Sequence, residues 1–288
     1  MINNRVNNET MSLAPVVGNT LRIGTGFSGL GFRHNQFDGK LDPMIMVDHY
    51  TMTSPTFGAH PHAGLSAVSI LFEDTQGKFN NRDSLGNDFD IEAGDLYWLN
   101  AGSGAIHDEA PRPGASIHGL QVFVNLPAHL KQQAPSSLHI KRENMPTLTG
   151  EGYRVRLVLG ESNENKAQQE SVWPVTILDG YADTRAQFNH QVQTGFNTWV
   201  YAVEGDIDVL VNGQTLTLKQ GTSMSFTFDE MSLLSIKGTV NSESHFVVMS
   251  GQPINEPFVQ QGPFAMSSQQ EIDAVITRYE AGEFGKLD

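Results

Sequence analysis

The strings His60-Pro61-His62 and His107-Asp108-Glu109 each place two potential metal ligands at positions i and i+2. In an extended strand, successive side chains alternate between the two faces, so residues i and i+2 point to the same side. Two such strands facing each other inside a small barrel can bring three imidazoles and one carboxylate to a single point. The predicted metal ligands are His60, His62, His107 and Glu109.

The chemistry of these ligands indicates a catalytic transition-metal site. Imidazole and carboxylate together suit Fe, Zn, Ni, Cu or Mn better than Ca. Four ligands on an octahedral ion leave two positions for water, substrate or dioxygen. The alternative is a pair of hydrogen-bonded structural histidines, since a lone His-x-His pair is weak evidence. The context favours the metal, because both strings end predicted strands within one segment.

The residues before His107 resemble the second motif of a cupin barrel. Ile91-Glu92-Ala93-Gly94-Asp95 forms a Gly-Asp turn, and the apolar strand Leu96-Tyr97-Trp98-Leu99 follows it. Gly102 and Gly104 then precede His107. The string from Arg82 to Asn87 is predicted to be a hairpin turn rather than a catalytic element, because its Asp, Ser, Gly and Asn residues favour turns.

The resemblance is closer to one family, the pirins, and it spans about residues 20 to 286. The matching motifs are His60-Pro61-His62-x-Gly64, Arg82-Asp83-Ser84-Leu85-Gly86-Asn87, Gly94-Asp95, Ala101-Gly102-x-Gly104, His107-x-Glu109, Gly119-Leu120-Gln121, Val124-Asn125-Leu126-Pro127, Gly251-x-Pro253-Ile254-x-Glu256-Pro257, Gly262-Pro263-Phe264-x-Met266 and Gly282-x-Phe284. Pirins are bicupins with one metal in the N-terminal barrel, bound by three histidines and a glutamate. The resemblance therefore implies an all-β fold of two tandem cupin (jelly-roll) barrels with a C-terminal α-helix. It also implies one divalent transition metal, with Fe favoured and Zn, Ni, Cu, Mn or Co as alternatives.

The chain departs from the family pattern close to the predicted ligands. Ala63, Leu65 and Ser66 stand where the family usually has Arg, Phe and Glu or similar residues, and Ser103 stands where it usually has Arg. We expect the ligands to be intact and the charged surroundings of the metal to be thinned. Neighbouring groups orient the ligands and tune the metal. Because these neighbours differ while the ligands are kept, metal binding is a safer inference than catalytic activity.

Four segments are predicted along the chain. They are the N-terminal metal-binding barrel 1–126, a linker 127–150, a metal-free C-terminal barrel 151–255, and a C-terminal extension 256–288 with a helix over 268–281. Residues 1–19 are polar and are expected to form a loose arm or an edge strand. The linker lacks strand alternation and carries three prolines. In the extension, Ser268 and Glu271 fit a capping box.

An apolar stripe predicts how the C-terminal helix packs. Ile272, Val275, Ile276 and Tyr279 lie at i, i+3, i+4 and i+7, and Gly282 ends the helix. We expect this stripe to cover a barrel rather than to bind a partner.

The second half echoes the first but lacks a ligand pair. The segment 199–209 repeats the order of residues 65–79, with an apolar strand, an acidic turn and a strand. Its histidines, His190 and His245, are isolated in the sequence, so no metal is expected there. Of the remaining histidines in the first half, His118 is the candidate to point inward.

Composition and charge exclude several classes of protein. The net charge of −14 and the scattered basic residues argue against direct nucleic-acid binding. No apolar run reaches the roughly 18 residues of a membrane span. The chain has no cysteine, which excludes disulfides and thiolate ligands. Its polar start lacks the apolar stretch of a secretion signal, so the cytoplasm is predicted.

Two classes of function remain open. The resemblance implies a dioxygenase of the quercetinase type, which opens a flavonol or a smaller enolic or catechol-like substrate with O2. Glu109 would then act as general base as well as ligand. The alternative is a non-enzymatic iron-binding redox sensor or regulator that acts through a protein partner. A serine hydrolase ranks third, because no Gly-x-Ser-x-Gly elbow is present.

Overall fold

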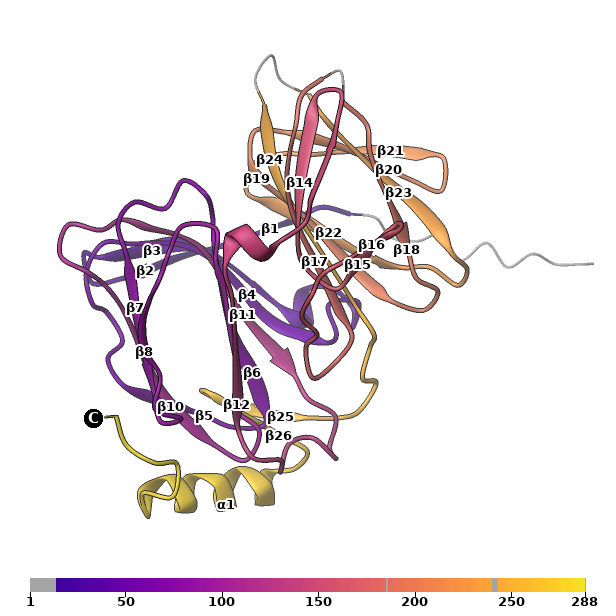
Figure 1. Cartoon of the computed structure of the whole chain (residues 1–288). Helices are drawn as coiled ribbons and strands as arrows, with labels where there is room; N and C mark the ends of the chain where they lie inside the picture. Colours follow the sequence, from indigo (N-terminus) through magenta and orange to yellow (C-terminus); the bar gives the residue numbers. More distant parts are fainter. Residues whose placement is uncertain (1–13, 185, 240–242, 288) are drawn as a thin grey trace, which may run out of the picture.

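Figure 1 shows the computed structural model of the chain, which describes residues 14–184, 186–239 and 243–287. The polar start of the chain lies largely outside these residues. None of the described helices is long and apolar enough to cross a membrane. The cytoplasmic location stays a prediction.

The N-terminal unit consists of two antiparallel sheets that face each other. Its large sheet has the order β12 (Ser136–Ile140), β9 (Leu96–Asn100), β6 (Leu65–Leu71), β11 (Ile117–Asn125), β4 (Met44–Met52), β3 (Phe27–Arg33) and β2 (Asn19–Ile23). Its small sheet has the order β5 (His60–His62), β10 (Ala105–Pro111), β7 (Phe79–Asp83) and β8 (Asp88–Ile91). A short 3-10 helix, η1 (His34–Gln36), follows β3.

The C-terminal unit repeats this plan. Its large sheet has the order β1 (Val16–Val17), β22 (Thr222–Thr227), β19 (Asn197–Glu204), β24 (Ser244–Gly251), β17 (Val175–Ala182), β14 (Tyr153–Leu159) and β13 (Thr147–Gly150). Its small sheet has the order β18 (Phe188–Val192), β23 (Ser232–Gly238), β20 (Ile207–Val211) and β21 (Gln214–Leu218), and β15 (Glu161–Ser162) pairs with β16 (Asn165–Lys166). The prediction of two tandem cupin units is confirmed. Within the described residues, each unit is a pair of separate sheets rather than a closed barrel.

The connecting segments contain more strand than the sequence indicated. Residues 127–150 include β12, which pairs with β9, and β13, which pairs with β14, together with the 3-10 helix η2 (Arg142–Asn144). The expectation of a linker without strands was therefore wrong. Strands of five and four residues are too short to give a clear alternating pattern. At the other end of the chain, β1 adds to the edge of the far unit by pairing with β22.

The two large sheets bury their outer faces against each other. Phe32 of β3 meets Trp199 and Tyr201 of β19 in edge-to-face contacts, with ring centroids 5.6 and 5.2 Å apart. All three side chains are fully buried in one apolar core that draws on both units. The inner face of the N-terminal large sheet is thus left for the interior of its own unit.

The C-terminal extension covers the N-terminal unit (Figure 1). It contains the hairpin β25 (Val259–Gln261) and β26 (Phe264–Met266), followed by α1 (Gln269–Glu280). The Ser268 Oγ accepts a hydrogen bond from the Glu271 N–H at 3.3 Å, as the predicted cap requires. Ile272 and Val275 are buried against Ala63, the residue that follows β5. The apolar stripe of the helix therefore covers the N-terminal unit, as predicted.

Candidate metal centre

Two neighbouring strands of the small sheet carry the predicted ligands. β5 pairs with β10 in a register that sets His60 opposite His107. His62 and Glu109 lie two residues further along their strands, so alternation turns all four side chains to the inner face. The prediction that the two strands face each other was wrong, because they are hydrogen-bonded neighbours in one sheet. Paired residues of an antiparallel ladder project to the same side, so adjacency brings the ligands together equally well.

The three imidazoles converge through their Nε2 atoms. The Nε2 atom of His107 lies 3.0 Å from that of His62 and 3.1 Å from that of His60. The His60 Nδ1 lies 2.8 Å from the Gly58 carbonyl and donates to it, which leaves the His60 Nε2 with a lone pair. One shared proton cannot satisfy three nitrogens, whereas one cation can.

The spacing of these nitrogens fits a transition metal. Ligand nitrogens about 2.1 Å from one ion, at right angles to each other, would lie about 3.0 Å apart. The two measured separations agree with this value. His60, His62 and His107 form the one group in the described part of the chain whose ligand atoms are close enough to hold an ion together.

Burial keeps the inner histidines neutral, as metal ligands must be. Burial, together with the neighbouring His60, lowers the pKa of His62 to about 3. Burial, together with His62 and His60, lowers the pKa of His107 well below its ordinary value. Both rings therefore keep a lone pair available at neutral pH.

Glu109 lies beside the three histidines, but its carboxylate turns to the large sheet. Both carboxylate oxygens lie 2.8 Å from the Oγ of Ser69 on β6. The nearer oxygen is 4.0 Å from the Nδ1 of His107. The structure thus brings three of the four predicted ligands to one point and places the fourth next to them. The role of Glu109 as a ligand stays a prediction.

The surroundings of Glu109 tune it as an acid–base group. Burial raises the pKa of Glu109 to about 7, although the hydrogen bond from Ser69 opposes this shift. The Ser69 Oγ also lies 3.0 Å from the side-chain oxygen of Gln121, so three groups from three strands form one network. A carboxyl group with a pKa near neutrality can accept a proton and return it.

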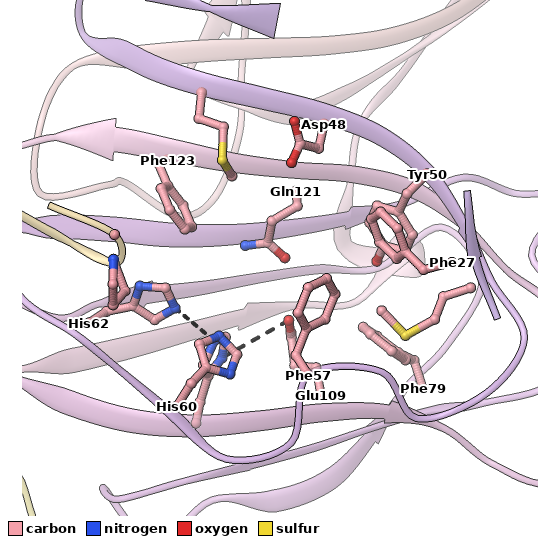
Figure 2. Close-up of a pocket in the computed structure, with 15 residues that line it drawn as sticks. Phe27, Asp48, Tyr50, Phe57, His60, His62, Phe79, Glu109, Gln121 and Phe123 are labelled. Atoms are coloured by element: carbon pink, nitrogen blue, oxygen red, sulfur yellow. Dashed lines mark hydrogen bonds and ion pairs between the residues drawn. The ribbon is translucent and has the colours of Figure 1, made fainter. Parts of the chain in front are cut away.

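An aromatic cavity of about 280 Å³ opens beside these groups. Figure 2 shows its wall, with His60, His62 and Glu109 on one side and Tyr50 and Phe79 on the other. The residues that line it are Phe27, Met46, Asp48, Tyr50, Met52, Phe57, His60, His62, Phe79, His107, Glu109, Gln121, Phe123, Gly262 and Pro263. Most of this surface is apolar, which suits a flat organic ligand.

The departures from the family pattern lie away from this cavity. Ala63 packs under the C-terminal extension, and its carbonyl accepts a hydrogen bond from the Ala265 N–H at 3.0 Å. The carbonyl of Ser103 accepts one from Arg278 of α1 at 2.9 Å. Ser66 is buried and lies 3.3 Å from Asn100. None of these residues is among those that line the cavity. The expectation that they thin the charge around the metal stays a prediction.

Four of the other histidines have partners inside the protein. The ring of His118 points to the interface between the units, where its Nε2 lies 2.7 Å from that of His49. In the second unit, His190 lies 3.0 Å from the Ser162 hydroxyl, and His245 lies 2.5 Å from a carboxylate oxygen of Asp179. The hairpin interpretation of the string after β7 is also supported, since Asp83 accepts from the Leu85 N–H at 2.9 Å.

Sequence reasoning missed two residues of the site. Ser69 lies in a strand whose seven residues are all buried, so no alternation distinguishes its inner face. Tyr50 lies in β4, where Asp48 and Tyr50 face the cavity while Val47 belongs to the core between the units. A strand covered on both faces lacks the alternation of apolar and polar residues that would mark its inner face.

Comparisons with known proteins agree with this fold. A family model described as Pirin matches residues 31–124, and one described as Pirin C-terminal cupin domain matches residues 177–285. A pirin-like protein of Arabidopsis thaliana is 34% identical over 85% of this chain and 89% of its own length. Pirin of Mus musculus is 30% identical over 89% of each chain.

A solved structure agrees over nearly the whole chain. Quercetin 2,3-dioxygenase from Acinetobacter baumannii superimposes with a TM-score of 0.83 at 28% identity, covering 95% of this chain and 98% of that one. The family models match both halves, and the relatives extend along most of the sequence. This chain therefore belongs to the pirin family of the cupin superfamily.

Proposed function

We propose that this protein is a metal-dependent dioxygenase of the quercetinase type, which opens a flavonol or a related enolic or catechol substrate with O2. The observation that carries the proposal is the convergence of three imidazoles at the wall of an aromatic cavity. The similarity to a quercetin 2,3-dioxygenase supports it.

The proposed ion is iron, held by His60, His62 and His107, with Glu109 as the fourth ligand. Imidazole and carboxylate ligands suit iron, and a redox-active metal suits reaction with dioxygen. When bound, the ion supplies Lewis acidity toward an enolic oxygen of the substrate. The hydrogen bond from His60 to the Gly58 carbonyl fixes the ring that carries one of the ligand nitrogens.

Glu109 is the proposed general base. A carboxylate that binds the ion through one oxygen keeps a second oxygen, which can accept the proton of an enolic or phenolic hydroxyl. Ser69 holds the carboxylate in place from the opposite sheet. The rings of Phe27, Phe79 and Phe123 line the cavity and would hold a flat substrate against these groups while excluding water.

Oxygen uptake tests the proposal. The metal-loaded protein should consume O2 with at least one member of a panel of flavonols and catechols. Glu109→Gln should lower turnover by about 10²- to 10⁴-fold. Its metal content should fall much less than its turnover. Asp108→Asn is the matched control, since Asp108 belongs to the same strand but pairs with Arg82 on the other face. Its turnover should stay close to that of the wild type.

Two outcomes would change the proposal. Equal losses of metal and turnover in Glu109→Gln would leave Glu109 as a ligand only. No oxygen uptake by the loaded wild type with any compound of the panel would favour the regulatory alternative, in which the iron-bearing protein acts on a protein partner.

A further inference from the structure

The hydroxyl of Tyr50 is a buried polar group without a partner. Tyr50 is 2% exposed, and its Oη forms no hydrogen bond with any described residue. A buried hydroxyl left in this state destabilises the folded protein. Burial, with the nearby Glu109 charge, raises the pKa of Tyr50 well above its ordinary value, so the hydroxyl is a donor at any physiological pH. A bound ligand that supplies an acceptor would satisfy this donor.

The position of Tyr50 indicates where that acceptor comes from. Tyr50 lines the same cavity as the three histidines, and its ring stacks on Phe27 with centroids 5.4 Å apart and planes 16° apart. Figure 2 shows Tyr50 across the cavity from His60 and His62. A flat ligand that reaches the histidines with one edge would therefore bring its opposite edge toward the Tyr50 hydroxyl.

The two other polar side chains of the wall each have an oxygen that already holds a hydrogen bond or ion pair. The carboxylate of Asp48 pairs with Arg33 at 2.5 Å. The side chain of Gln121 lies 3.0 Å from Ser69. Apart from the histidines, Tyr50 is thus the residue among the described wall residues that has a fully buried polar side-chain atom without a hydrogen-bond partner.

We propose that Tyr50 is the specificity residue of this cavity, where its hydroxyl donates a hydrogen bond to an oxygen atom on the outer ring of an aromatic substrate. The inference rests on the proposed function and narrows it, because it selects aromatic substrates that carry an oxygen at the edge away from the metal-binding enol. A site built to bond such an oxygen discriminates against analogues that lack it, since the buried donor would then stay unpaired.

Ligand binding to the Zn²⁺-loaded full chain tests this inference, because zinc has no redox chemistry and holds the complex before turnover. The probes are quercetin, with hydroxyls on its outer rings, and unsubstituted flavonol, without them. Tyr50→Phe removes only the hydroxyl. It should weaken quercetin binding about tenfold and leave flavonol binding within about twofold. Equal changes for both probes, or no change for quercetin, would overturn the inference.

Thermal unfolding of the ligand-free protein gives a second readout. Tyr50→Phe should keep or raise the melting temperature, because it removes an unpaired donor. Tyr201→Phe is the matched control, since the Tyr201 hydroxyl is bonded to His49 at 2.6 Å outside the cavity. It should lower the melting temperature and leave the preference for quercetin unchanged. A lower melting temperature for Tyr50→Phe would show that its hydroxyl is structural and would overturn the inference.

The two proposals fail in different ways. If the wild type binds quercetin and consumes oxygen but Tyr50→Phe binds equally well, only the specificity inference fails. If neither probe binds the zinc-loaded wild type, the flavonol class fails together with the role of Tyr50. If the probes bind and discriminate but no oxygen is consumed, the dioxygenase proposal alone fails.

Discussion

The small sheets of the two units have the same strand order but different inward side chains. In the N-terminal unit, β5 and β10 place His60 opposite His107. In the C-terminal unit, β18 and β23 occupy the same places in the sheet and set His190 opposite Leu234. The fold alone therefore does not create a metal centre. A few inward positions on two short strands decide whether the interior of a cupin unit carries ligands or an apolar core.

The interiors differ in packing as well as in chemistry. The N-terminal unit keeps an aromatic cavity of about 280 Å³ beside its histidines. The interior of the C-terminal unit is filled by apolar side chains, with Phe226 and Phe246 fully buried. Its single inward histidine on β18 is bonded to Ser162. The predicted absence of a metal from this unit stays a prediction, and the variants below test the contrast.

The largest effect is expected in the packed interior. Phe226→Ala should lower the free energy of unfolding by about 3–5 kcal/mol, because it opens a void in a core where Phe226 is fully buried. Phe57→Ala is the control in the cavity wall, where the ring is 49% exposed, and should cost less than about 1 kcal/mol. Urea unfolding measures both values. Similar losses would contradict the contrast between a filled and an open interior.

The second effect concerns the metal. His107→Leu gives the N-terminal unit the residue type that Leu234 supplies in the C-terminal unit. It should weaken metal binding more than about 100-fold, since loss of a group that merely supports a ligand already costs 10- to 100-fold. The control His190→Leu should keep one ion per chain. Loss of metal in His190→Leu, or two tightly bound ions in the wild type, would contradict the assignment.

The third effect tests the interface that joins the units. The Nδ1 of His49 accepts from the Tyr201 hydroxyl at 2.6 Å, and its Nε2 lies 2.7 Å from His118, whose Nδ1 donates to Asp74. Burial, with the charges of His118 and His245, lowers the pKa of His49 to about 3. In the unfolded chain His49 is protonated near pH 6.5. The stability that the neutral, buried His49 contributes is therefore complete above that pH and is lost as the pH falls toward 3.

At pH 5 the loss from this group should be about 2 kcal/mol relative to pH 7 or above. His49→Gln should remove that part of the pH dependence, whereas His129→Gln, at an exposed histidine, should not. Urea unfolding at the two pH values, with a chelator present throughout, measures the difference. An unchanged slope in His49→Gln would mean that other groups govern the acid sensitivity.

The smallest effect concerns the extension that the N-terminal unit alone carries. Ser268→Ala removes the side-chain cap of α1 and should cost about 1 kcal/mol of stability. Metal content should stay at one ion per chain, because the helix packs behind the ligand strands. Loss of metal in this variant would show that the extension also shapes the site.

Local patterns explain what the sequence could predict. The i, i+2 spacing in His60-Pro61-His62 and His107-Asp108-Glu109 is a property of any strand, so the shared face followed directly. The helix 268–281 was predicted from its cap and stripe and was found at Gln269–Glu280. The resemblance to a family supplied the two-unit architecture, which composition alone did not indicate.

The features of the fold and the site that the sequence did not predict depend on contacts between residues far apart in the chain. The pairing of β5 with β10 joins residues more than forty positions apart, and no local pattern distinguishes neighbouring from facing strands. Ser69 and Tyr50 lie in strands that are covered on both sides, so their inward direction left no trace in the hydrophobic pattern. The substitution at Ala63 lies beside a ligand in the sequence, yet its side chain faces the C-terminal extension.

Anomalous X-ray scattering from crystals of the metal-loaded protein tests the central claim most directly. Data collected at the absorption edge of the metal locate each bound ion without any assumption about its ligands. We predict one peak per chain, between the Nε2 atoms of His60, His62 and His107. A peak at His190 or His245, or no peak at the three histidines, would contradict the assignment of metal chemistry to the N-terminal unit.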